Sequence, residues 1–202
     1  MVGKTMNDDA YKKRMQRKKQ HIDDAVKEAD IERGIVVLLT GNGKGKSSSA
    51  LGMALRALGH DMLVGIVQFI KSWTNTGEQL FLQQQKGVDF HIMGTGFTWD
   101  TQDKEKDRAA AIALWNKAAA MLNDSSLGMV ILDELTYMIS YQYLDMQEVI
   151  TAIRNRPENQ HVIITGRAAS QELLDIADTV SEIKDIKHAF REGIKAMPGI
   201  EW

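Results

Sequence analysis

Six short apolar runs, separated by stretches with a helical pattern, most constrain what this chain can fold into. The runs cover residues 35–39, 63–69, 88–93, 129–133, 161–165 and 179–183. They are too short for ordinary helices and are rich in β-branched residues, which suits buried strands. Helical patterns occupy residues 46–59, 104–123, 146–155 and 170–177, and in the second of these Ile112, Trp115, Ala119 and Leu122 share one face. This alternation predicts an α/β domain in which a mostly parallel six-stranded sheet is covered by helices on both faces.

The composition is that of one compact domain. The chain has 202 residues, of which 44% are hydrophobic and 26% charged, with a formal net charge of -2. This charge does not indicate a nucleic-acid or membrane partner, and the apolar runs are too short to span a bilayer. There is no cysteine, which excludes disulfides, thiolate metal sites and cysteine nucleophiles, and fits a reducing cytoplasm.

Residues 1–33 differ from the rest of the chain. They are polar, with the basic run KKRMQRKK at 12–19 followed by an acidic stretch. Ile22, Val26 and Ala29 recur at helical spacing, so part of the segment could dock on another surface. We therefore expect a helical arm over 1–33, acting as a lid over the active site, and a single domain over 34–202.

A glycine-rich turn, GNGKGKS at 41–47, joins the first expected strand to the first expected helix. It is one residue short of the usual phosphate-binding loop, because Thr40 stands where that pattern has its first glycine. Glycines can adopt positive φ, and successive N–H groups at the start of a helix form an anion site. Lysine ammonium groups and an asparagine amide add donors for phosphate oxygens. The predicted triphosphate site consists of Gly41, Asn42, Gly43, Lys44, Gly45, Lys46 and Ser47.

A second feature extends this site to a metal ion. The apolar strand at 129–133 ends in Asp133, and Glu134 follows it. In phosphate-loop proteins a carboxylate at the end of a neighbouring strand holds Mg²⁺ together with the hydroxyl of the loop, here Ser47. Ser47, Asp133 and Glu134 therefore predict a site for Mg²⁺ or Mn²⁺. These residues alone leave the reaction open among a RecA-like motor, a small-molecule kinase and a nucleotidyl or alkyl transferase.

Further motifs narrow this choice. The segments are GNGKGKSSSALG (41–52), VQFIKS (67–72), GFTWDTQ (96–102), VILDELTYM (130–138), VIITGR (162–167) and ADTVSEIKDIKHAFREGIKAMPGIEW (177–202). Together, in this order, they resemble the ATP:corrinoid adenosyltransferases of the CobA/BtuR type, from about residue 30 to the C-terminus. The resemblance implies a RecA-like P-loop NTPase domain. It also implies that Co(I) of a corrinoid attacks the 5′ carbon of ATP and expels inorganic triphosphate.

The resemblance also implies roles for individual residues. Lys44 and Lys46 would stabilise the leaving triphosphate, and Arg56 would reach a phosphate. Phe97 and Trp99 would occupy the lower face of the corrin, giving four-coordinate Co(II), which is easier to reduce. The corrinoid would be cobalamin, cobinamide or cobyrinic acid a,c-diamide. The family further implies a homodimer and an electron donor such as reduced flavin or flavodoxin.

Two other classes of function stay open at the level of sequence. One is a nucleic-acid-dependent ATPase that uses the basic run at 12–19. The other is a regulatory module that binds ATP and a corrinoid without turnover. The transferase differs from both, because it alone forms a carbon–cobalt bond and releases triphosphate.

Overall fold

The computed structural model describes residues 8–70, 76–93 and 103–201. Phe97 and Trp99 lie outside these ranges. The chain divides into two compact units, Met1–Glu32 and Arg33–Trp202, and each is described by itself.

The first unit contains one long helix, α1 (Asp8–Glu28). Its lysine, arginine and glutamine residues have a high intrinsic helix propensity. Ile22 and Val26, the apolar residues at helical spacing, have exposed fractions of 50% and 67%. Within the described part of this unit these two side chains are not buried, and the lid function of the arm stays a prediction.

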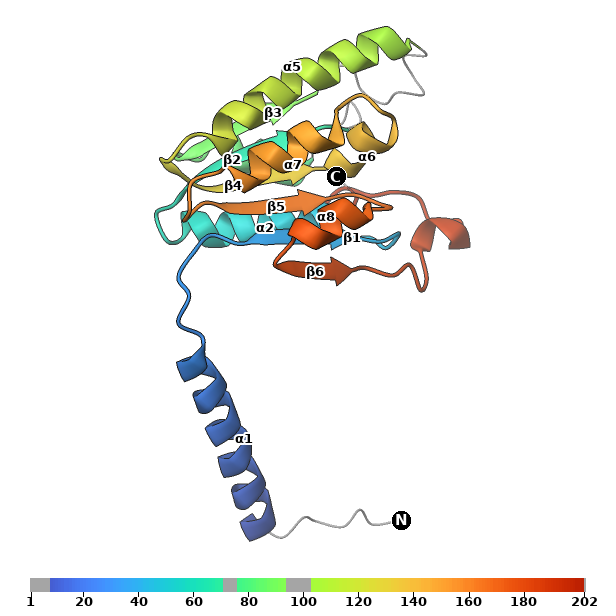
Figure 1. Ribbon diagram of the computed structural model, residues 1–202. Coiled ribbons are helices and arrows are strands. Elements are labelled where there is room, and N and C mark those ends of the chain that lie inside the picture. The colour runs from blue at the N-terminus through green and yellow to red at the C-terminus, as the bar shows by residue number, and fades with distance from the viewer. Residues whose placement is uncertain (1–7, 71–75, 94–102, 202) are drawn as a thin grey trace. The chain divides into compact units, whose positions relative to one another are not determined.

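The second unit is built on a six-stranded sheet (Figure 1). Its strands are β1 (Val36–Thr40), β2 (Leu63–Gln68), β3 (Val88–Ile92), β4 (Leu127–Asp133), β5 (His161–Thr165) and β6 (Thr179–Glu182). The spatial order is β3-β2-β4-β5-β1-β6, and every neighbouring pair is parallel. The inner strands are buried on both faces, which explains their nearly continuous Val, Ile and Leu runs. The predicted α/β fold is confirmed.

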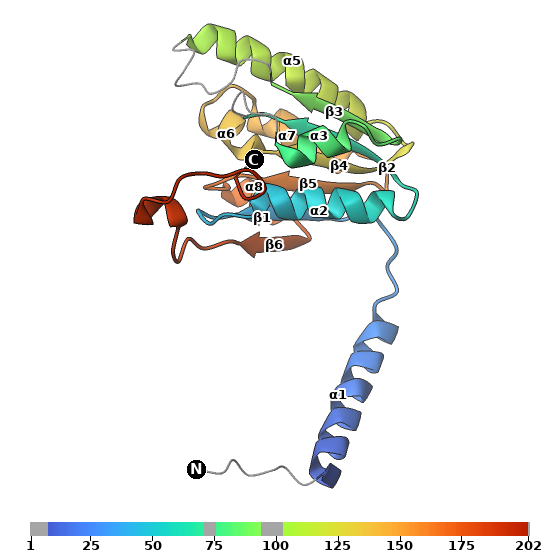
Figure 2. The same cartoon turned by 180° about the vertical axis from the view of Figure 1, so that it is seen from behind.

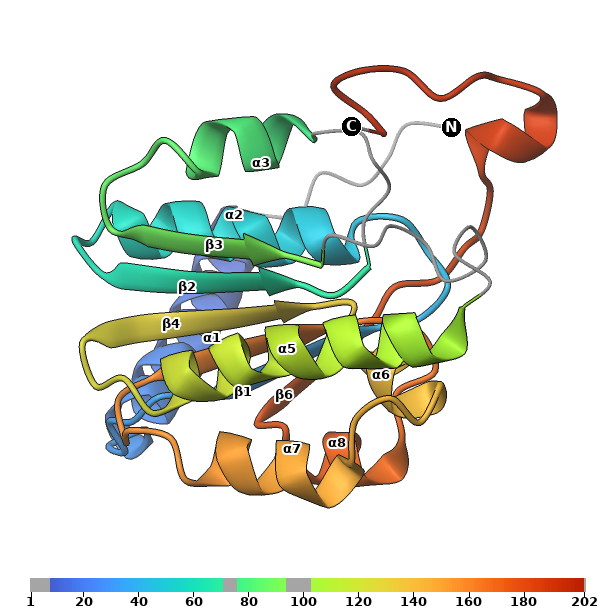
Figure 3. The ribbon, with the colours of Figure 1, turned by 90° about the horizontal axis from the view of Figure 1, so that it is seen from above.

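Helices cover both faces of this sheet (Figures 1, 2 and 3). One face packs against α2 (Lys46–Leu58) and α3 (Gly77–Leu82) through residues such as Leu39, Ile66 and Leu82. The other packs against α5 (Lys104–Leu122), α6 (Leu135–Ser140), α7 (Met146–Arg154) and α8 (Gln171–Ile176). A 3-10 helix, η1 (Ala189–Glu192), lies in the segment after β6. The chain after β6 lies at the end of the sheet to which the strand arrows point (Figure 3).

The buried face of α5 differs from the predicted one. Ile112 has an exposed fraction of 41%, whereas Ala111 and Ala118 are fully buried. The alanines occupy the surface that faces the sheet, where a small side chain lets a helix pack closely. Trp115 is buried as expected, and its indole N–H donates to Glu148 on α7 over 2.8 Å.

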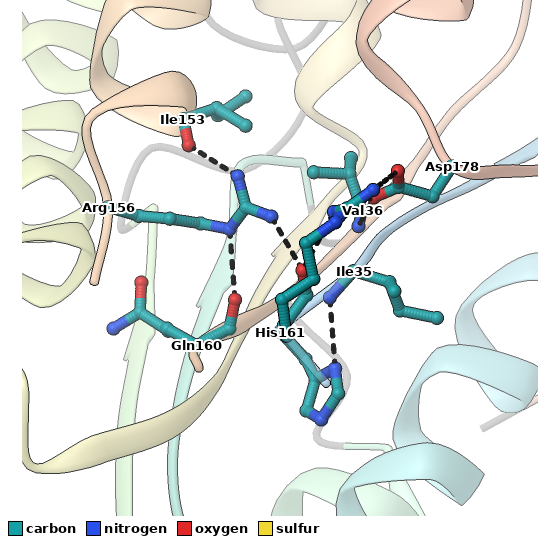
Figure 4. A network of polar contacts seen from close by, with 9 residues as sticks. Ile35, Val36, Ile153, Arg156, Gln160, His161 and Asp178 are labelled. Carbon is teal, nitrogen blue, oxygen red and sulfur yellow. Dashed lines mark hydrogen bonds and ion pairs between the residues drawn. The ribbon is translucent and has the colours of Figure 1, made fainter. Parts of the chain in front are cut away.

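A network of polar contacts fixes the amino-terminal ends of β1 and its neighbours (Figure 4). Arg33 contacts both carboxylate oxygens of Asp178 at 2.5 and 3.1 Å, and Asp178 accepts from the Val36 N–H at 2.8 Å. Arg156 donates to the carbonyl oxygens of Ile153, Gln160 and Gly34. The network ties the start of β1 to the chain around β5 and β6, at the end of the strands opposite the glycine-rich turn.

Candidate functional site

The glycine-rich turn after β1 is shaped by close contact with the chain beyond β6. Gly41 and Gly45 have positive φ, 97° and 118°. Gly43 does not adopt the positive φ open to it. Instead, a Cβ atom at Gly43 would lie 2.6 Å from the Lys184 carbonyl oxygen, and its N–H donates to Ile183 over 2.7 Å. Glycine at 43 is therefore required by the approach of another backbone rather than by its own φ.

Lys46 lies within this turn and is almost fully buried. Its exposed fraction is 6%, and its Nζ donates to the carbonyl oxygens of Gly41 at 2.9 Å and Gly43 at 3.0 Å. Burial lowers the pKa of Lys46; Arg167 adds to this effect, while the charge of Glu134 opposes it. The ammonium group is thus held over the turn by neutral carbonyls, where phosphate oxygens could replace them as acceptors.

The two carboxylates at the end of β4 have different surroundings. Asp133 is fully buried and accepts from Thr165 Oγ1 at 2.6 Å and from Gln68 Nε2 at 2.8 Å, which links β2, β4 and β5. Glu134 has φ 60° and lines a cleft beside the turn. Of the two predicted metal ligands at this strand end, Glu134 lines the cleft and Asp133 braces the strands beneath it.

The cleft has a volume of about 1270 Å³ and lies at the carboxyl ends of the strands. From the turn and α2 it is lined by Asn42, Gly43, Lys44, Gly45, Lys46, Ser47 and Ser48. Thr76, Gly77 and Glu78 border it at the start of α3, and Arg167 borders it after β5. The opposite wall comes from the chain after β6, where Glu201 accepts from Lys44 Nζ over 2.7 Å. Ligands of parallel α/β sheets bind at this end of the strands.

The donors in the cleft suit a magnesium ion bound with a nucleotide. Ser47, in the first turn of α2, and Glu134 both line the cleft and offer a hydroxyl and a carboxylate oxygen, which are hard ligands. In the described parts of the chain, no group of three or more His, Cys, Asp or Glu side chains could hold a metal ion. Mg²⁺ in nucleotide sites is held by one or two protein ligands, with water and phosphate oxygens completing the shell. The side chains present therefore fit such an ion.

Comparison with known proteins identifies the family that has this site. The family model described as ATP:corrinoid adenosyltransferase BtuR/CobO/CobP matches residues 32–202. The chain belongs to that family. It is 52% identical over 197 residues to the corrinoid adenosyltransferase of Escherichia coli K12, covering 98% of this chain and 100% of the relative. It is 51% identical over 197 residues to the corrinoid adenosyltransferase CobA of Salmonella typhimurium LT2, with the same coverage. The identity to the Pseudomonas aeruginosa corrinoid adenosyltransferase is 48% over 196 residues, with 96% and 97% covered.

Membership of the adenosyltransferase family confirms the enzyme class expected from the sequence motifs. ATP and a corrinoid fit the family as substrates, whereas the comparisons give no support to a nucleic-acid-dependent ATPase. Within residues 8–70, 76–93 and 103–201, no helix is both long and apolar enough to cross a membrane.

The structure does not bring every predicted residue to the cleft. Arg56 lies in the last turn of α2 and is exposed, and at the helical rise of about 1.5 Å per residue it is about 15 Å along the axis from Lys46. It does not line the cleft, and its phosphate contact stays a prediction.

Other cleft residues were not predicted from the sequence. They are Ser48, Thr76, Gly77, Glu78, Arg167, Glu182, Lys184, Asp185, His188, Phe190, Arg191, Gly199, Ile200 and Glu201. Most of them belong to the family-like segments VIITGR (162–167) or 177–202, which the resemblance had already singled out. Nothing in the spacing of these segments predicts that they lie beside the glycine-rich turn.

Proposed function

We propose that this adenosyltransferase moves the 5′-deoxyadenosyl group of ATP to the Co(I) centre of a corrinoid and releases inorganic triphosphate. The electron pair of Co(I) forms the cobalt–carbon bond. The bond between the 5′ carbon and its oxygen breaks, and the electron pair of this carbon–oxygen bond leaves on the triphosphate oxygen. The observation that supports this most is the shared cleft of the glycine-rich turn, buried Lys46 and Glu134, in a chain of this family.

The protein's part in this reaction is to hold the triphosphate and to stabilise its growing charge. The N–H groups of the turn, Lys46 and Lys44 supply positive potential along one wall of the cleft. Ser47 and Glu134 would hold Mg²⁺, which would neutralise part of the triphosphate charge. Asp133 would act indirectly, since its hydrogen bonds with Gln68 and Thr165 keep the end of β4 in place.

The corrin side of the reaction is proposed from the family resemblance. Phe97 and Trp99 would exclude the lower axial ligand of the corrinoid, which would be cobalamin, cobinamide or cobyrinic acid a,c-diamide. The segment 1–33 would close over the site and exclude water. A homodimer, a reduced flavin or flavodoxin as electron donor, and a cytoplasmic location belong to the same proposal.

One experiment separates the transferase from its alternatives. The protein is incubated anaerobically with Mg-ATP, cobalamin and a strong chemical reductant, and visible spectra are recorded before and after illumination. We expect a light-sensitive alkylcobalt product and one inorganic triphosphate per product. Orthophosphate without that product would overturn the proposal in favour of an ATPase, and binding without any turnover would favour a regulatory module.

A further inference from the structure

The order of the strands places one unassigned arginine between the two halves of the site. In the sheet, β5 lies between β4 and β1. Glu134 follows β4, the glycine-rich turn follows β1, and Arg167 follows β5. All three line the same cleft, so Arg167 stands between the proposed metal ligand and the phosphate loop.

We propose that Arg167 binds the triphosphate of ATP and stabilises the charge that collects on it as it leaves. A guanidinium is planar and offers five donors in a rigid fork, which suits phosphate oxygens. The ligand named here rests on the proposed function, but the binding of a triphosphate by Arg167 can be measured without a corrinoid.

The backbone on both sides of Arg167 is held in a rare conformation. Gly166 has φ 148° and Ala168 has φ 49°. A Cβ atom at Gly166 would lie 1.9 Å from Thr136 Oγ1, so only glycine fits there. The Gly166 N–H donates to the Leu39 carbonyl over 3.2 Å, which holds the segment after β5 against β1. Strain of this kind persists where surrounding structure enforces it, and it clusters at ligand sites.

The charges in the cleft distinguish Arg167 from the other cations. Lys44 pairs with Glu201 at 2.7 Å, Lys184 with Glu182 at 3.9 Å, and Arg191 with Asp185. Among the residues that the structure describes, Arg167 makes no ion pair or hydrogen bond of its side chain.

Burial is the main cause that lowers the pKa of Lys46, and the positive charge of Arg167 lowers it further. Two cations that line the same cleft are both stabilised when an anion binds there.

The test compares Arg167→Ala and Arg167→Lys with a matched control, Arg154→Ala. Arg154 is exposed in the last turn of α7 and does not line the cleft. Calorimetry measures the affinity for inorganic triphosphate with Mg²⁺ and, separately, for adenosine. We expect Arg167→Ala to weaken triphosphate binding about 10- to 100-fold, the loss typical of a hydrogen-bonded charge, with adenosine affinity unchanged within about twofold. Arg167→Lys should recover only part of this loss, because an ammonium lacks the fork.

A merely structural role would give a different pattern. It would lower the melting temperature and weaken both ligands together, and that result would overturn the proposal. Triphosphate binding by Arg167→Ala equal to that of Arg154→Ala would also overturn it, as would a wild-type protein that binds no triphosphate. If triphosphate binding depends on Arg167 but the wild type forms no alkylcobalt product, the proposed reaction fails while the assignment of Arg167 stands.

Discussion

Charged side chains have different surroundings at the amino-terminal and carboxyl-terminal ends of the strands. At the amino-terminal ends, Arg33 and Asp178 satisfy each other, and Arg156 donates to three carbonyl oxygens. At the carboxyl-terminal ends, Arg167 lines an open cleft, and Lys46 donates to two carbonyl oxygens that phosphate oxygens could replace. A polar group that is satisfied within the protein contributes to stability, whereas one that faces a cleft is available to a ligand. Substitutions at the amino-terminal ends should therefore alter stability, whereas substitutions at the carboxyl-terminal ends should alter ligand binding and turnover.

The largest effect is expected at the carboxyl end, from Lys46→Ala. It removes the buried ammonium from the loop and should slow adenosyl transfer about 100- to 1000-fold, as loss of a preorganised donor to a developing charge does. The melting temperature should change little, because relief from burying a charged lysine offsets the loss of its hydrogen bonds to Gly41 and Gly43. Single-turnover kinetics and thermal unfolding check both parts. Lys117→Ala, at an exposed position of α5, is the control, and a Lys46→Ala protein that turns over as fast as this control would refute the comparison.

At the amino end, Gly34→Ala should reduce stability and leave ligand binding unchanged. A Cβ atom there would lie 2.2 Å from the Gln160 carbonyl oxygen, so the backbone must shift. We expect a loss of about 1–3 kcal/mol in the free energy of unfolding, as for other overpacked sites, with triphosphate affinity unchanged. Urea unfolding and calorimetry measure the two quantities.

Gly52→Ala is the matched control for this glycine. Gly52 lies within α2, and an added Cβ would have no neighbour within 4 Å. There the same change should stabilise the protein by about 0.5–1 kcal/mol, since alanine loses less entropy in a helix. Equal effects of Gly34→Ala and Gly52→Ala would show that the amino end tolerates rearrangement.

The two ends also differ in how far the sequence predicts them. Strands β1, β4 and β5 were predictable because strands buried on both faces leave nearly continuous apolar runs. The helix α3 was missed because its apolar residues, Leu80, Phe81 and Leu82, are consecutive and show no helical period, whereas the equally short α8 was predicted. The position of Glu134 in the cleft followed from its place after a strand.

The C-terminal wall of the cleft did not follow from the sequence. Residues 183–201 form no long element, and their position depends on close approach to Gly41 and Gly43. Such a contact between distant, irregular segments leaves no periodic pattern. The glycines of the turn were predicted from the sequence, but for their φ angles and for the ligand, not for the close approach of residues 183 and 184.

A pH-dependent effect of moderate size is expected at the amino end. The hydrogen bond from Arg33 lowers the pKa of Asp178, and the Val36 N–H and the charge of Arg156 act in the same direction. A carboxyl group whose folded pKa is lowered stabilises the fold above its unfolded pKa, about 3.9, and loses this effect as pH falls through the folded value. The stability difference between the wild type and Asp178→Asn should therefore be constant above about pH 5 and shrink through pH 4 and below. Urea unfolding from pH 7 to pH 3 measures it, and a difference independent of pH would contradict the pairing.

The smallest effect is expected from Glu201→Gln, which returns to the carboxyl end. The Lys44–Glu201 pair is partly exposed, with side-chain fractions of 42% and 28%, so its loss should change stability by less than about 0.5 kcal/mol. The Glu201 carboxylate and a bound triphosphate would compete for the ammonium group of Lys44. Removing the charge of Glu201 should therefore tighten triphosphate binding about two- to fivefold, the range of a weak ion pair.

A control and a second substitution show whether that gain comes from Lys44. Glu192→Gln breaks the exposed pair with Lys187 at 3.9 Å, and neither of its residues lines the cleft, so triphosphate affinity should not change. In a Lys44→Ala background, Glu201→Gln should give no gain, because the cation for which it competed is gone. A gain that persists there would mean that Glu201 repels the ligand directly. The C-terminal segment would then oppose phosphate binding by its own charge, not by occupying a loop cation.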